Sequence, residues 1–97
     1  MEKKPSVISY VLRRLERTVE TTRVRRDEVG GMQRLAVAIF AIEEYLDILE
    51  GCKLTMAEAR EANNALIALI DQSMMIPEVK YQLEHCRRSI EVDYFHR

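Results

Sequence analysis

Four side chains in the sequence are metal ligands by type: Cys52, His85, Cys86 and His96. Their spacing does not favour a zinc site, because the chain has no Cys-x-x-Cys or His-x-x-x-His pair. His85 and Cys86 are adjacent, so on a helix they point about 100° apart. A di-iron site in a helical bundle would need two Glu-x-x-His motifs, and none occurs. We therefore expect no metal and no cofactor.

The acidic residues do not form an obvious catalytic pair either. Glu43, Glu44, Asp47 and Glu50 follow one another at the spacing of a solvated helix face. With only three glycines, the chain contains no P-loop and no dinucleotide-binding fingerprint. These patterns favour a protein without enzymatic activity.

One enzymatic alternative is an all-helical enzyme of the chorismate mutase type. Enzymes of that family are small helical dimers in which several cationic side chains surround a dicarboxylate. Arg13, Arg17 and Arg25 would supply the cations here. Beyond the first predicted helix the sequence departs from the pattern of that family, so this function is kept only as an alternative.

The arginines also raise the alternative of a nucleic-acid-binding regulator. Residues 1–34 contain nine Lys and Arg against five Asp and Glu, a net charge of +4, whereas residues 35–97 carry six against eleven, or −5. A basic N-terminal helix could dock on its own acidic neighbours or on a polyanion. The candidate polyanion-binding residues are Arg13, Arg14, Arg17, Arg23, Arg25 and Arg26.

The elements that position these residues are predicted to be helices of one domain, residues 1–97. Hydrophobic residues make up 47% of the chain and charged residues 32%, which favours a folded chain with a soluble surface. Three glycines and two prolines are too few for the many turns of a β fold. The N-terminus has no secretory signal pattern. The apolar run 35–42 is far shorter than the about 20 residues that span a bilayer.

Apolar residues at three- and four-residue spacing predict helices at about 6–28, 32–50, 56–74 and 77–94. Ser6 is the expected N-cap of the first, and the glycine pair at 30–31 would end it or only bend it. Thr55 and Glu58 form a capping box before the third, and Pro77 suits the first position of the fourth. Short linkers make sequential helices antiparallel neighbours. The predicted fold is all-α: a small up-down four-helix bundle, or two helical hairpins completed by dimerisation.

The second predicted helix has more apolar surface than one buried stripe requires. A heptad seam of Met32, Leu35, Ile39, Ile42, Leu46 and Leu49 accounts for one side. Phe40 lies nearly opposite that seam at about 100° per residue. Either this helix is central and touches several neighbours, or its second face binds another protein. With the C-terminal aromatic residues, the candidate partner-binding residues are Val37, Phe40, Ala41, Ile48, Tyr94 and Phe95.

These patterns predict a non-enzymatic protein–protein interaction module that acts through an exposed apolar helix face. Domains of this size and class serve as adaptors, chaperones, anti-activators or inhibitors. The expected partner is another protein, with a homodimer as the leading form. Cys52 and Cys86 fit free thiols in a reducing cytoplasm, although a disulfide between them is an alternative.

Overall fold

The computed structural model describes residues 7–24, 31–72 and 76–95, with side chains described for 7–22, 35–72 and 76–95. No strand occurs in these ranges, so the prediction of an all-α fold is confirmed. A π-helical turn continues the last of four α-helices. The elements are α1 (Val7–Val24), α2 (Gly31–Gly51), α3 (Met56–Ile70), α4 (Pro77–Ile90) and the turn η1 (Glu91–Phe95).

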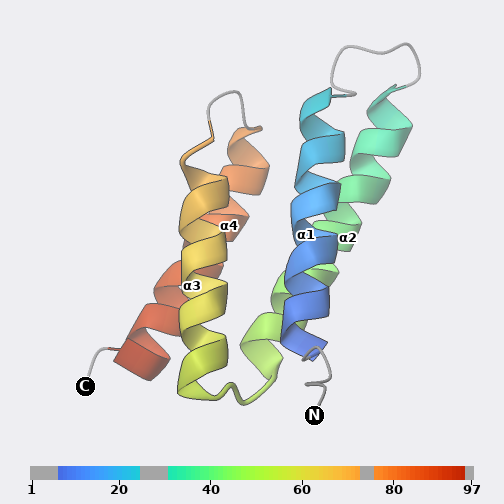
Figure 1. Cartoon of the computed structure of the whole chain (residues 1–97). Helices are drawn as coiled ribbons and strands as arrows, with labels where there is room; N and C mark the ends of the chain where they lie inside the picture. Colours follow the sequence, from blue (N-terminus) through green and yellow to red (C-terminus); the bar gives the residue numbers. More distant parts are fainter. Residues whose placement is uncertain (1–6, 25–30, 73–75, 96–97) are drawn as a thin grey trace.

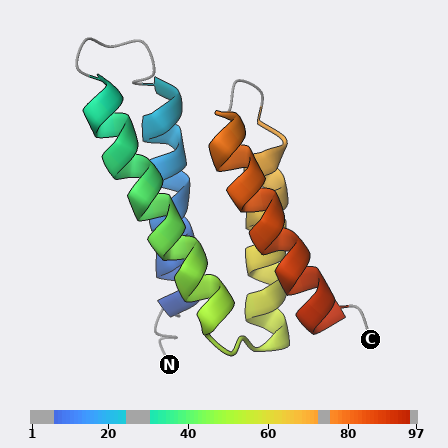
Figure 2. The ribbon, with the colours of Figure 1, turned by 180° about the vertical axis from the view of Figure 1, so that it is seen from behind.

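The helices form two antiparallel hairpins, α1–α2 and α3–α4, which pack side by side (Figures 1 and 2). Across the two hairpins, α1 packs on α3 and α2 packs on α4. The chain direction alternates from one helix to the next, as predicted, so the helices that pair across the hairpins run parallel (Figure 1). Each helix packs most extensively on the other helix of its own hairpin, and the consecutive helices α2 and α3 make few contacts with each other.

The helix limits differ from the predicted ones at several points. Because α1 and α2 lie antiparallel, they are two helices and not one helix bent at the glycine pair. The expected N-cap Ser6 and residues 25–28 of the first predicted helix lie outside the described residues. α2 extends through Gly51, one residue beyond its expected end. α3 ends at Ile70, four residues early.

Local hydrogen bonds explain where α3 begins and ends. The predicted capping box is confirmed: the Glu58 amide donates to Thr55 Oγ1 at 3.1 Å, and the Thr55 amide donates to the Glu58 carboxylate at 2.9 Å. At the other end, the Gln72 amide donates to the Leu69 carbonyl at 3.2 Å. This three-residue spacing is that of a 3₁₀ turn, which ends the α-helix. Pro77 occupies the start of α4, as predicted.

The core is formed by one apolar stripe from each helix. Leu15, Ala59, Ala62, Leu66 and Leu83 are completely buried. The small residues at the start of α3 let its backbone approach the neighbouring helices closely. The predicted stripes are confirmed for the following buried residues: Ile8, Val11, Leu12, Leu15, Val19 and Thr22 of α1; Ile42, Leu46 and Leu49 of α2; Ala59, Ala62, Leu66 and Leu69 of α3; and Val79, Leu83, Cys86 and Ile90 of α4.

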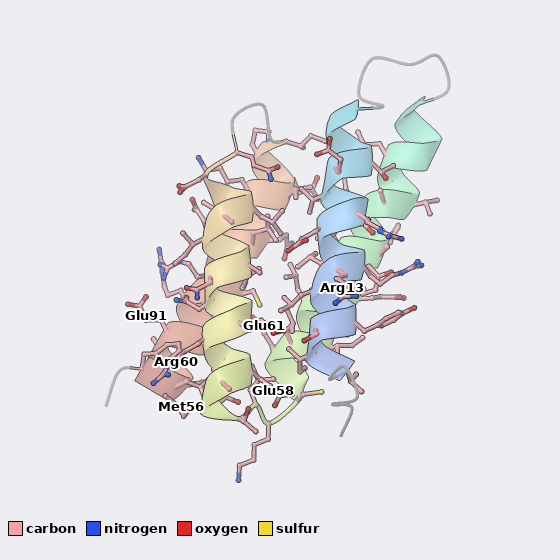
Figure 3. All side chains as sticks on the ribbon, viewed as in Figure 1. Arg13, Met56, Glu58, Arg60, Glu61 and Glu91 are labelled. Atoms are coloured by element: carbon pink, nitrogen blue, oxygen red, sulfur yellow. The ribbon has the colours of Figure 1, made fainter. Side chains whose placement is uncertain are left out.

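Two hydrogen bonds join parts of the chain that are far apart in sequence. Ser9 Oγ of α1 donates to the Glu61 carboxylate of α3 at 2.6 Å, and Glu61 extends from α3 toward α1 (Figure 3). At the end of the bundle, the amide of the buried loop residue Leu54 donates to the Tyr94 hydroxyl at 2.8 Å. These bonds connect the first hairpin to α3 and the α2–α3 loop to the C-terminal turn.

Candidate functional site

The outer surface of the α1–α2 hairpin contains a shallow hollow of about 370 Å³, which we call the outer groove. α1 supplies cationic and hydroxyl side chains to it, and α2 supplies mainly small apolar ones. Its lining residues are Arg14, Arg17, Thr18, Thr21, Val37, Ala38, Ala41 and Tyr45.

Helical spacing explains why these residues line the groove and do not enter the core. Arg14, Arg17 and Thr21 follow one another at three and four residues along α1, and therefore form an edge beside its buried stripe. On α2, Val37 and Ala41 are four residues apart on the edge that faces α1. Because Ala41 is small, the two helix edges leave a space between them.

Among the candidate partner-binding residues of α2, two side chains are largely exposed to solvent and a third is partly exposed. Val37 is 69% exposed, Phe40 68% and Ile48 40%, while Ala41 is half-buried in the groove. α2 meets α1 and α4 through its buried side, and this leaves the opposite side of the helix uncovered. The packing of a single chain therefore does not use Val37, Phe40 or Ile48 as core. Their binding of a partner stays a prediction.

The α1 side of the groove is positively charged. The Arg14 guanidinium lies near the Tyr45 hydroxyl of α2, and its interaction with Tyr45, with a smaller effect of Tyr10, raises the pKa of Arg14. The hydroxyls of Thr18 and Thr21 donate to the carbonyls of Arg14 and Arg17 at 2.7 and 2.9 Å, on their own helix. Their donors are already used, so the guanidinium groups are the strong donors that α1 offers to a ligand in the groove.

The structure divides the candidate polyanion-binding arginines into separate groups. Arg14 and Arg17 line the outer groove, whereas Arg13 is exposed on α1 and is not part of the groove lining (Figure 3). The side chain of Arg23 lies outside the described residues, as do Arg25 and Arg26. Arg25 was one of the three cations of the chorismate mutase alternative, so the described residues do not test that set.

The C-terminal aromatic residues do not join the outer groove. Tyr94 is half-buried, packs against the core and accepts a hydrogen bond from the Leu54 amide, so only part of its side chain is left for a partner. Its binding of a partner stays a prediction. Phe95 is 37% exposed. Both belong to η1, which packs on α3 and α4, in the other hairpin (Figures 1 and 2). The candidate partner-binding residues therefore lie on two separate surfaces, one on α2 and one on η1.

Sequence reasoning missed the contribution of α1 to the groove. Thr18 and Thr21 of α1, and Tyr45 of α2, were not among the candidate site residues, although all three line the groove. Their position follows from the antiparallel register of α1 and α2, which places Arg14 beside Tyr45. The signal in the sequence was the glycine pair at 30–31, which is compatible with a reversal of the chain but does not fix its register.

Other features offer less to a ligand. A second hollow, about 340 Å³, lies between α3 and α4 and is lined by both charge signs: Ile67, Ile70, Asp71, Glu84, Arg87 and Arg88. The cysteines are free thiols, with Cys52 exposed and Cys86 buried.

Burial, with smaller effects of Glu50 and Asp47, raises the pKa of Cys86 to about 12. Among the described residues, no three His, Cys, Asp or Glu side chains are grouped as metal ligands.

No helix in the described ranges has the length and apolar character to cross a membrane. No protein-family model, curated protein or solved structure matches this chain.

Proposed function

We propose that this protein is a non-enzymatic binding module, and that it recognises another protein through the outer groove together with Phe40 and Ile48 of α2. The observation that carries the proposal is the 68% exposure of Phe40, next to Val37 at 69%, on a helix whose opposite side already fills the core. A partner that covered either side chain fully would gain about 1.5–3 kcal/mol from removing it from water.

The composition of this surface supports a protein as the ligand. Protein interfaces are enriched in aromatic residues and arginine, and their strongest contacts sit in apolar pockets surrounded by polar groups. The outer groove combines these residue types, because apolar Val37 and Ala41 line it together with Arg14, Arg17 and Tyr45. An adaptor, chaperone, anti-activator or inhibitor would act through such a surface. The free thiols of Cys52 and Cys86 support activity in the reducing cytoplasm.

The polyanion alternative has weaker support from the same surface. Of the candidate arginines whose side chains the structure describes, Arg14 and Arg17 line the groove and Arg13 does not, and the exposed Glu44 lies on the neighbouring edge of α2. A carboxylate at this place repels the phosphates of a nucleic acid. We therefore assign the groove to a protein ligand.

The test is affinity capture from native lysate with two matched variants. Phe40→Glu places a charge on the proposed surface, and Tyr81→Glu places the same charge on α4 at a position that is also 68% exposed. Both variants should retain the helical circular dichroism of the wild type. We expect Phe40→Glu to lose the captured partner and Tyr81→Glu to keep it. Equal capture by the wild type and both variants, or unfolding of Phe40→Glu alone, would contradict the proposal.

A further inference from the structure

The outer groove has the chemistry to receive an apolar helix edge that carries carboxylates. Its α1 side offers two guanidinium groups, from Arg14 and Arg17, and its α2 side offers the aliphatic surface of Val37, Ala38 and Ala41. Arginine pairs well with carboxylates, and apolar helix edges fit between two helices. A purely apolar ligand would leave the two guanidinium groups without an anionic partner, and a purely acidic one would leave the aliphatic side uncovered.

The chain itself carries a helix edge of this kind. Phe40, Glu44 and Ile48 are spaced four residues apart along α2, so they form one line on its outer surface. All three are exposed, and Asp47 adds a second exposed carboxylate one turn from Glu44. We call this line the α2 edge. The outer surface of the hairpin therefore has a basic stripe on α1 beside an acidic and apolar stripe on α2.

We propose that the outer groove binds the α2 edge of a second copy of this chain, in a dimer whose two-fold axis runs parallel to α1 and α2. This inference rests on the proposed function of the groove. A two-fold interface uses the same patch on both subunits, so the patch must be complementary to itself. The proposed axis places α1 of each subunit on α2 of the other, and Arg14 and Arg17 then face Glu44 of the partner subunit.

The charges decide between this axis and the other two-fold arrangement of the same faces. An axis perpendicular to the helices would place α1 on α1 and α2 on α2. The basic stripe of α1 would then face the basic stripe of the partner subunit, and the acidic stripe of α2 would face its own copy. Juxtaposed like charges disfavour an interface, whereas complementary stripes fix its register. The axis parallel to the helices places the basic stripe of each subunit against the acidic stripe of the other.

The test uses charge reversals that separate the two stripes. Arg14→Glu/Arg17→Glu makes both stripes acidic, and Glu44→Arg/Asp47→Arg makes both basic. As a control, Arg60→Glu/Arg88→Glu reverses two exposed arginines of the α3–α4 hairpin. The measurement is the mass in solution by sedimentation equilibrium over a range of concentrations. Circular dichroism confirms that each variant is folded.

We expect the wild type and the control to reach the mass of two chains with the same Kd. Each stripe variant alone should dimerise at least about tenfold more weakly, and an equimolar mixture of the two should recover a mixed dimer. A wild type with the mass of one chain at every concentration would overturn the inference, as would a mixture that dimerises no better than its components.

Failure of this inference is distinguishable from failure of the proposed function. If the wild type is a monomer but loses a captured protein on Phe40→Glu and not on Tyr81→Glu, the groove binds a different protein and the second copy is excluded. If Phe40→Glu changes neither mass nor capture, both proposals are wrong.

Discussion

At the scale of single residues, the two thiols should differ strongly in reactivity. Cys86 is 1% exposed, and burial raises its pKa to about 12, so at neutral pH it carries its proton and is out of reach of reagents. Cys52 is exposed in the α2–α3 loop. We expect one thiol per chain to react rapidly with a chromogenic disulfide reagent and the second to react only as the protein unfolds.

The variant Cys52→Ser identifies the two thiols in this assay. It should abolish the fast phase and leave the slow one, which urea then accelerates. Rapid reaction of Cys86 in folded Cys52→Ser would show that α4 does not pack on the core in the way described.

A second residue-scale prediction concerns the hydroxyl of Tyr94. Tyr94→Phe removes the acceptor of the Leu54 amide, which lies in a residue only 5% exposed. We expect the free energy of unfolding in urea to fall by about 1–3 kcal/mol, the usual cost of an unsatisfied buried donor. The matched variant Tyr81→Phe removes an exposed hydroxyl and should change stability little. Equal stability of the wild type and Tyr94→Phe would mean that water reaches the Leu54 amide.

This hydrogen bond also shows what the sequence does not contain. Leu54 is an isolated apolar residue in a loop, and Tyr94 lies near the C-terminus, 40 positions away. Helical periodicity predicts which face of α4 is buried, but not which distant backbone group lies beyond its last turn. The sequence therefore offered Tyr94 as a candidate for partner binding and gave no sign of its bond to the Leu54 amide.

At the scale of elements, the sequence predicted best where the causes are local. The capping box of Thr55 and Glu58 involves residues within one turn, and the buried stripe of α1 depends only on spacing along one helix. The end of α3 was predicted poorly. The prediction carried the helix to residue 74 across the polar residues Asp71, Gln72 and Ser73, whereas the α-helix ends at Ile70 and the Gln72 amide donates to the Leu69 carbonyl.

Close packing at the start of α3 leads to a prediction for that element. Ala62 is completely buried between the helices, so the larger side chain of Ala62→Leu would overpack the core. Overpacking of this kind costs about 1–3 kcal/mol in the free energy of unfolding. Ala68→Leu makes the same substitution at an exposed position of α3 and should be nearly neutral. If both variants unfold at the same urea concentration, α3 does not approach its neighbours as closely as the structure shows.

At the scale of the whole molecule, the sequence predicted the alternating helix directions but not which helices pack together. Short linkers imply antiparallel neighbours along the chain. However, α2 packs mainly on α1 and α4, and α3 on α4 and α1, because the α2–α3 loop crosses the end of the bundle. The position of each helix depends on the sum of its long-range contacts, which no single helix pattern encodes.

For the candidate site too, the sequence predicted the properties of one helix but not the contacts between two helices. The exposure of Val37 and Phe40 corresponds to their angular position on α2 and is a property of one helix. The groove needs two helices: Arg14 meets Tyr45 only because α1 and α2 pack in one particular register. For this reason the apolar half of the site was predicted together, while its basic half was assigned to a different function.

The measurement that tests the proposed binding surface most directly is hydroxyl-radical footprinting, read by mass spectrometry, of the chain diluted until it is a monomer and of the chain in complex. Phe40 and Tyr81 have equal exposure and lie in different hairpins, so each serves as the reference for the other. We predict that oxidation of Phe40 falls sharply in the complex, whether the partner is a second copy or another protein, while oxidation of Tyr81 is unchanged. Protection of Tyr81 with Phe40 still fully oxidised would contradict the assignment of the outer groove.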